Sequence, residues 1–269
     1  MRVVEATKPD RAESREEPEV LVAVEDLRCH FGGVRAVDGA SFAVERGKVM
    51  GLIGPNGAGK STALKAIGGA VPSSRGSVQL EGTELLGRRP HQVARLGVIR
   101  SFQLGGEFGR LTVMENLLVA APRPRGEGLA GALLGRRWWG RAEAALVDRA
   151  RELLARFDMD AHENEYAANL SGGQRRIVEI CRALMAGPRI LLLDEPMAGV
   201  NRSMARRIEA CLLDLREEGL TMLLVEHELG TVERLCDAVV VMALGKVIAQ
   251  GSMGGLRERE EVLSAYLAG

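Results

Sequence analysis

The sequence lacks the bulk features of nucleic-acid-binding and membrane-spanning proteins. Lys plus Arg and Asp plus Glu both number 36, so the net charge is zero. A balanced charge gives no long-range attraction to a polyanion, and no nucleic-acid partner is expected. The longer apolar runs, such as Ile190 to Leu193 and Ala238 to Leu244, are much shorter than the roughly 20 residues that cross a bilayer. Any membrane function would therefore need partner subunits.

Cysteine is also scarce. The sequence has four cysteines, which are widely spaced and form no C-x-x-C pair: Cys29, Cys181, Cys211 and Cys236. A disulfide framework or a zinc site is therefore not expected, and all four are predicted to be buried as small hydrophobic residues. Residues 1–19 are charged and contain no apolar run of the signal-peptide kind. They predict a disordered tail on a cytoplasmic protein.

Apolar patterns predict an α/β fold in the first part of the chain. The expected strands cover residues 20–27, 40–45, 49–53 and 77–80. A helix from Ser61 to Gly68 should end at a pair of glycines. Residues 85–165 are expected to form a mainly helical subdomain, because no strong strand pattern separates the helix patterns there. An irregular insert at 122–140 interrupts this subdomain, and a helix is expected at 141–157.

The second half alternates between helix and strand patterns. Helices are expected around 177–184 and 204–215, and strands at 189–195 and 220–226. Such alternation predicts parallel strands joined by crossover helices. A hairpin at 238–250, turning at Gly245, and a final helix ending at Tyr266 complete the chain. Trp138 and Trp139 either contact a partner or lipid headgroups, or pack over the helical subdomain.

A glycine-rich segment follows the strand at 49–53 and matches the pattern G-x-x-x-x-G-K-[ST]. It consists of Gly54, Pro55, Asn56, Gly57, Ala58, Gly59, Lys60, Ser61 and Thr62. Its glycines let successive backbone N–H groups face one anion, and the following helix adds its positive end. Lys60 is expected to reach the β- and γ-phosphates of a nucleotide, and the Ser61 hydroxyl is expected to ligate Mg²⁺.

Two carboxylates stand where the apolar strand at 189–195 ends. In a parallel sheet this edge is where ligands bind. Asp194 is predicted to hold Mg²⁺, directly or through water. Glu195 is then the candidate general base that polarises a water in line with the γ-phosphate. The alternative is that these acids only cap the start of a helix before Pro196.

The segment Leu170, Ser171, Gly172, Gly173 and Gln174 precedes a helix and lies between the phosphate loop and the carboxylate pair. At a helix N-terminus, its hydroxyl and backbone amides form a second anion site. With this segment the chain resembles the ABC ATPase family. The resemblance covers residues 20–268 and implies a single ABC ATPase domain. Its phosphate-loop core would carry an antiparallel β subdomain and a helical subdomain that extends to this signature segment.

The resemblance also implies roles for other residues. In the family, the signature segment contacts the γ-phosphate bound to a second subunit, which implies a head-to-tail dimer with ATP at the interface. Gln103 corresponds to the glutamine that touches Mg²⁺ and the attacking water and relays nucleotide state to the membrane partner. His227 corresponds to the switch histidine that contacts the γ-phosphate. Phe31 corresponds to the aromatic residue that stacks on adenine, with Val37 near the ribose.

Residues 198–201 match the family's D-loop, which crosses the dimer interface. Two neighbouring residues depart from the common pattern, because Arg202 stands where proline is frequent and Met197 where a small or aromatic residue is common. Both changes are expected to alter communication between the two ATP sites rather than to abolish hydrolysis.

Within the family, the chain is most similar to importer ATPases for branched-chain amino acids and related amides. Segments 100–103, 111–118, 225–228 and 265–267, together with the insert before Arg141, carry this likeness. It implies transmembrane permease subunits, a second ATPase subunit, an extracytoplasmic solute-binding protein and a place at the cytoplasmic face of the membrane. The ATPase of lipopolysaccharide export is an alternative. A non-transport ABC ATPase is a further alternative, although the segment between Gln103 and Leu170 is too short for the long coiled coil of such proteins.

Overall fold

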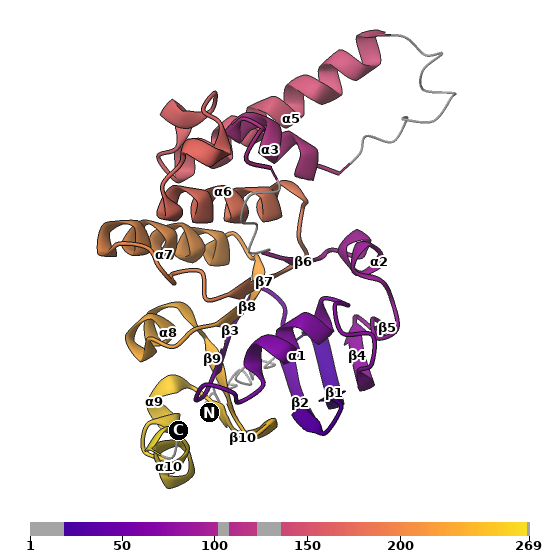
Figure 1. Ribbon diagram of the computed structural model, residues 1–269, viewed down its shortest axis with the longest axis vertical. Helices are drawn as coiled ribbons and strands as arrows, with labels where there is room; N and C mark the ends of the chain where they lie inside the picture. The colour runs from indigo at the N-terminus through magenta and orange to yellow at the C-terminus, as the bar shows by residue number, and fades with distance from the viewer. Residues whose placement is uncertain (1–18, 102–107, 123–135, 268–269) are drawn as a thin grey trace, which may run out of the picture.

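The main sheet carries the edge at which the predicted site lies. The computed structural model describes residues 19–101, 108–122 and 136–267, and in it six strands line up in the order β10-β9-β3-β8-β7-β6 (Figure 1). Their bounds are β3 Val49–Ile53, β6 Val98–Arg100, β7 Ile190–Asp194, β8 Thr221–Val225, β9 Ala238–Ala243 and β10 Lys246–Gly251. The strands from β9 to β6 are parallel, and β10 is antiparallel to β9. Every residue of β3, β7 and β8 is buried, as in a parallel sheet covered on both faces.

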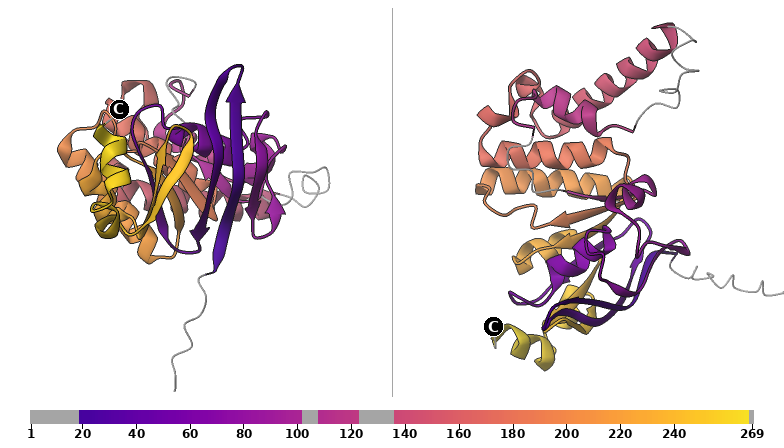
Figure 2. Two further views of the ribbon diagram at one scale, coloured as in Figure 1. Left: turned by 90° about the horizontal axis from the view of Figure 1, so that it is seen from below. Right: turned by 45° about the vertical axis from the view of Figure 1, so that its right-hand side comes forward.

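A second, antiparallel sheet lies against one face of the main sheet. Its order is β2-β1-β4-β5, with β1 Val20–Phe31, β2 Val34–Glu45, β4 Arg75–Leu80 and β5 Thr83–Glu84. Helix α1 (Lys60–Ile67) packs between the two sheets (Figures 1 and 2). Its buried Leu64 and Ile67 share a hydrophobic cluster with residues of β1, β2, β4 and the main sheet. The N-terminus of α1 is thereby held at the carboxyl edge of β3.

Helices cover the opposite face of the main sheet. Helices α6 (Gly172–Met185) and α7 (Arg202–Glu217) lie nearest to β7 and β8, and α3 (Val113–Ala120) and α5 (Arg136–Arg156) pack on α6 farther from the sheet (Figure 1). Alternate residues of each strand point to this side, because Leu191 and Leu193 belong to the helical cluster whereas Leu192 belongs to the α1 cluster. The short helices α2 (Pro90–Arg95), α8 (Leu229–Leu235), α9 (Met253–Leu256) and α10 (Glu260–Leu267) complete the described fold.

The architecture confirms the predicted fold class, and the β9–β10 hairpin turns at Leu244 and Gly245 as expected. Two strands were not predicted, the two-residue strand β5 and the strand β6. β6 lies inside the range 85–165 that we expect to be mainly helical, and it pairs with β7 in the main sheet. Its three residues are too few to show a strand period, so only the pairing with β7 reveals it. The division into a core and a helical subdomain remains a prediction.

Two smaller expectations are corrected. Helix α5 begins at Arg136, so the end of the expected irregular insert at 122–140 is helical; Trp138 and Trp139 lie in that helix, and residues 123–135 lie outside the described parts. Cys29, Cys181 and Cys211 are buried, but Cys236 is partly exposed. Cys236 closes helix α8 at its C-terminus, where the chain turns toward the surface.

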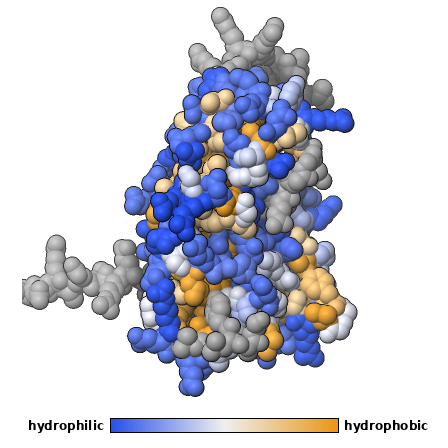
Figure 3. Space-filling view, turned by 60° about the vertical axis from the view of Figure 1, so that its left-hand side comes forward, coloured by the Kyte–Doolittle hydropathy of each residue, from blue (hydrophilic) through white to orange (hydrophobic). Residues whose placement is uncertain are grey.

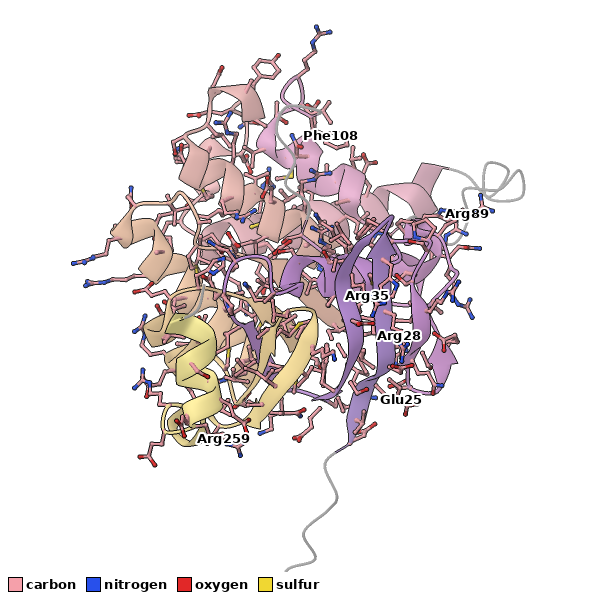
Figure 4. All side chains as sticks on the ribbon, turned by 60° about the horizontal axis from the view of Figure 1, so that its bottom comes forward. Glu25, Arg28, Arg35, Arg89, Phe108 and Arg259 are labelled. Atoms are coloured by element: carbon pink, nitrogen blue, oxygen red, sulfur yellow. The ribbon has the colours of Figure 1, made fainter. Side chains whose placement is uncertain are left out.

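Hydrophilic residues cover most of the face shown in Figure 3, with hydrophobic residues scattered among them. Within the described ranges, no helix has the length and apolar character that crossing a membrane requires.

Candidate functional site

The phosphate loop leaves β3 and closes on itself before α1. Gly54 has φ +142° and Gly59 has φ +99°, values that residues with a side chain rarely adopt. A Cβ at Gly54 would lie 2.0 Å from the carbonyl oxygen of Met242, and one at Gly59 would lie 2.2 Å from that of Ala36. The loop therefore has its shape because strand β9 on one side and strand β2 on the other press directly on its backbone.

Lys60 is the first residue of α1, and only 5% of it is exposed. Its ammonium group donates to the carbonyl oxygens of Gly54 at 2.8 Å and Pro55 at 2.9 Å. Burial lowers the pKa of Lys60, and the nearby Glu195 and Asp194 carboxylates oppose that shift. In this state the lysine satisfies the loop's own carbonyls, in the cradle where a phosphate would be bound.

Asp194 brings the carboxyl edge of β7 to the start of α1. Its Oδ1 accepts a hydrogen bond from the Ser61 hydroxyl at 2.9 Å, and its Oδ2 accepts one from Arg100 at 3.1 Å. Within the described ranges, no three His, Cys, Asp or Glu side chains form a metal cluster. A hydroxyl and one carboxylate side by side are nevertheless the oxygen ligands that suit Mg²⁺, which completes its shell with phosphate oxygens and water.

Glu195 and His227 meet across the ends of β7 and β8. The Nε2 atom of His227 lies 2.5 Å from Oε1 of Glu195. Glu195 has φ +50°, and its backbone N–H continues the β7–β8 pairing by donating to Val225 at 2.9 Å. About a third of the Glu195 side chain is exposed, so it can reach a water molecule. The strand ends thus bring together the predicted base and the predicted switch histidine.

The structure places the two predicted base-binding residues differently. Phe31 ends β1 and is 51% exposed, as a stacking platform must be. Val37 is fully buried, and a Cβ at Gly59 would lie 3.3 Å from its side chain. A contact between Val37 and a ribose would need an exposed side chain, so here Val37 instead supports the phosphate loop from behind. Gln103 lies outside the described residues.

The signature segment forms the exposed N-terminus of α6. The Ser171 hydroxyl accepts a hydrogen bond from the Gln174 backbone at 3.3 Å, and the Gln174 side chain accepts one from the Ser171 N–H at 2.9 Å. This is a reciprocal capping box. A Cβ at Gly172 would meet nothing within 4 Å. The segment therefore presents an open helix N-terminus in a single chain, separate from the phosphate loop in sequence.

Three further residues bear on the site and were not assigned a role from sequence alone. Arg100 pairs with Asp194, Arg176 donates to backbone carbonyls of the turn after β7, and Glu226 accepts from the N–H groups of Met197 at 3.2 Å and His227 at 3.3 Å. Glu226 is 5% exposed, and burial raises its pKa. Glu226 could have been noticed, because it directly follows an apolar strand just as Glu195 does. The two arginines carry no comparable signal.

A glycine-rich anion cradle, a buried lysine, a hydroxyl beside one carboxylate and a second carboxylate at the strand edge define a phosphate-loop nucleotide hydrolase. The signature segment at 170–174, which begins helix α6, adds the feature by which the sequence resembles one family among these enzymes. The family model of the ABC transporter matches residues 37–198. The chain therefore belongs to the ABC transporter family and is an ATP-binding cassette with the ATPase chemistry of that family.

Curated relatives cover nearly the whole chain. The high-affinity branched-chain amino acid transport ATP-binding protein LivG of Salmonella typhimurium is 37% identical over 92% of this chain and 97% of the relative. The corresponding protein BraF of Pseudomonas aeruginosa is 36% identical with the same coverage. The predicted resemblance is therefore confirmed.

Solved structures agree. A nucleotide-free ATP-binding cassette from an ABC transporter has a TM-score of 0.79 and 33% identity, and the match covers 92% of this chain and 98% of that one. The ADP conformation of an ATP-binding cassette has a TM-score of 0.78 and 31% identity over 93% and 99% of the two chains. These likenesses extend over both sheets and the helical layer, so the described fold is that of a cassette.

Proposed function

We propose that this chain is the ATP-hydrolysing subunit that powers import of branched-chain amino acids or related amino acids and amides across the cytoplasmic membrane. The observation that carries the proposal is that Lys60, Glu195 and His227 lie together at one sheet edge, in a chain 37% identical to LivG over 92% of its length. The solute itself is not determined by the residues of this chain, because the site described here handles the nucleotide.

The chemistry at the site is phosphoryl transfer to water. Lys60 leaves the carbonyls of Gly54 and Pro55 and binds the β- and γ-phosphates of ATP, together with the backbone N–H groups of the loop. Glu195 accepts the proton of the water whose oxygen attacks the γ-phosphorus, and the bond to the ADP oxygen breaks. His227, already 2.5 Å from Glu195, orients that carboxylate and contacts the γ-phosphate.

Mg²⁺ is part of the proposal. Ser61 and Asp194 would hold it, with Gln103 as a third ligand, and the ion would neutralise charge on the phosphate oxygens. Arg100, which pairs with the other oxygen of Asp194, keeps that carboxylate oriented toward Ser61. The ribose and base would lie toward the exposed Phe31, which stacks on adenine.

The working unit in this proposal is a head-to-tail dimer at the cytoplasmic face of the membrane. Ser171, Gly172 and Gly173 of one subunit bind the γ-phosphate held by the other, which agrees with the exposure of Ser171 and Gly172 at the start of α6. The dimer moves two transmembrane permease subunits, and an extracytoplasmic solute-binding protein delivers the solute. Nucleic acid has no role in this scheme.

Substitution Glu195→Gln tests the hydrolytic mechanism. The amide cannot take the proton, so turnover should fall by a factor of about 100 or more. Binding of MgATP, measured by calorimetry, should change little because the phosphate loop is untouched. Glu217→Gln, an exposed residue near the end of α7, is the matched control and should hydrolyse ATP at the normal rate. Wild-type turnover in Glu195→Gln would contradict the assignment.

Mass spectrometry of proteins that co-purify with the chain from gently solubilised membranes tests the transport role. The importer reading predicts two multi-span permeases, a second ATPase subunit and a solute-binding protein. Recovery of lipopolysaccharide-export components would leave the proposed ATP hydrolysis standing but contradict the proposed import of amino acids. Recovery of soluble nucleic-acid-binding proteins alone would overturn the transporter role.

A further inference from the structure

Arg176 lies in helix α6 and is almost completely buried. Its Nη2 donates to the carbonyl oxygens of Asp194 at 3.0 Å and Glu195 at 2.5 Å, and its Nε donates to that of Pro196 at 3.3 Å. Glu179, one turn along the same helix, accepts from Nη1 at 2.9 Å. A planar guanidinium, whose donors form a rigid fork, thus holds three consecutive carbonyls of the chain.

These carbonyls belong to residues 194–196, called the catalytic turn below, which orients the carboxylate of Glu195. Glu195 has a positive φ, a conformation that persists only when surrounding contacts hold it. The N–H of Glu195 is fixed to Val225 on one side, and its carbonyl also accepts from the N–H of Ala198 at 3.0 Å. Arg176 binds the same carbonyl from the helical layer. The direction of the Glu195 side chain therefore depends on where helix α6 holds Arg176.

The same helix begins with the signature segment. Ser171 caps α6, and Arg176 lies about one and a half turns further along. We propose that Arg176 is a positioning residue that ties the signature helix to the catalytic turn. When Ser171 binds the nucleotide held by the partner subunit, helix α6 is held in one position. Arg176 then fixes the orientation of Glu195 in the ATP site of its own subunit. This inference rests on the head-to-tail dimer of the proposed function and adds the link by which one ATP site senses the other.

A methionine at position 176 keeps the length and bulk of the side chain but removes every donor. Arg176→Met should lower kcat by about 10- to 100-fold, because small displacements of a catalytic group have effects of that order. The Kd for MgATP, measured by calorimetry, should stay within about twofold, because Lys60 and the loop are unchanged. Arg176→Lys, which keeps one charged donor, should recover part of kcat.

Arg149→Met is the matched control. Arg149 also donates to a backbone carbonyl, that of Leu184 near the other end of helix α6, at 3.0 Å. Because Arg149 is exposed, its variant should lose less thermal stability than Arg176→Met, and it should keep kcat. A kcat loss that is the same in Arg149→Met and Arg176→Met would show that Arg176 only holds the layers together, and would overturn the inference.

A double-mutant cycle with Glu195→Gln distinguishes a positioning role of Arg176 from a purely structural one, because only the positioning role acts through Glu195. If Arg176 acts by aiming Glu195, Arg176→Met should have no further effect on the residual hydrolysis of Glu195→Gln. Equal fold-losses in both backgrounds would overturn the inference. ATP-driven dimerisation of Glu195→Gln, followed by light scattering, tests the proposed function separately. If that dimer fails to form, the proposed coupling between the two subunits is wrong. The double-mutant cycle of Arg176 and Glu195 would still test whether Arg176 positions Glu195 within one subunit.

Discussion

Two helices of this cassette begin at glycine-rich segments, and the structure holds them in different ways. Helix α1 begins after Gly59 without any side-chain cap, whereas α6 begins after Ser171, which caps it reciprocally with Gln174. The free N–H groups of α1 are thus available to an anion from the start. Those of α6 are partly satisfied within the segment.

The glycines of the two segments also differ. A Cβ at Gly54 would collide with the backbone of β9, whereas a Cβ at Gly172 would point into open space. The phosphate loop therefore needs its glycines in order to fold. The signature segment needs Gly172 only for what approaches it from outside the chain. The comparison teaches that glycine is required by the fold at one site, whereas at the other its role lies in the proposed contact with a partner subunit.

The largest effect on stability is expected from Gly54→Ala. The added Cβ would lie 2.0 Å from the Met242 carbonyl oxygen, on a backbone with φ +142°, so both overpacking and backbone strain oppose it. Together they should lower the free energy of unfolding by about 3 kcal/mol or more. Urea unfolding of the purified chain measures this. A loss below about 1 kcal/mol would contradict the conclusion that the phosphate loop needs Gly54 in order to fold.

Lys60→Met should separate binding from folding. The methionine removes a buried cation, which favours the folded state, but it also leaves the carbonyl oxygens of Gly54 and Pro55 without their donor. The two effects oppose each other, so the free energy of unfolding should fall by only about 1 kcal/mol. Loss of the charged donors to phosphate should weaken ATP binding by about 100-fold, or about 2.7 kcal/mol. Calorimetric titration with ATP in the presence of Mg²⁺ checks the affinity, and unchanged affinity would contradict the assignment of Lys60.

Ser171→Ala should have a moderate effect on the folded chain. The hydroxyl that accepts from the Gln174 N–H is lost, and removal of such a cap costs about 1 kcal/mol. Thermal unfolding measures the change. Ser171→Asp, which can still cap the helix, should restore the stability but repel a phosphate, so its melting temperature and its ATPase activity should move in opposite directions.

The smallest effect on stability is expected from Gly172→Ala. Because its Cβ meets no atom in the single chain, the free energy of unfolding should stay within about 0.5 kcal/mol of the original. ATP-driven dimerisation should nevertheless weaken, because the methyl group lies where the partner's phosphate would approach. Unfolding curves compared with Gly54→Ala give the sharpest contrast, and equal losses would show that both segments serve the fold alike.

Much of the fold was readable from the chain. The apolar strands that carry Ile53, Asp194 and Val225 are continuous runs ended by glycine or acid, and the helices between them repeat apolar residues at helical spacing. The short strand β6 was missed because three residues carry no period, and only pairing with β7 makes it a strand. Val37 was placed near the ribose from the family pattern, yet packing buries it behind Gly59.

By itself, the sequence predicted which groups would do the chemistry, because the phosphate loop, the carboxylate pair and the signature segment are local patterns whose residues are neighbours in the chain. Tertiary structure decided how those groups are held. Arg100 lies 94 residues from Asp194, and Arg176 lies 19 residues from the Glu195 carbonyl it binds. Contacts between distant segments depend on how sheets and helices stack, and no local pattern of residues encodes that distance or direction.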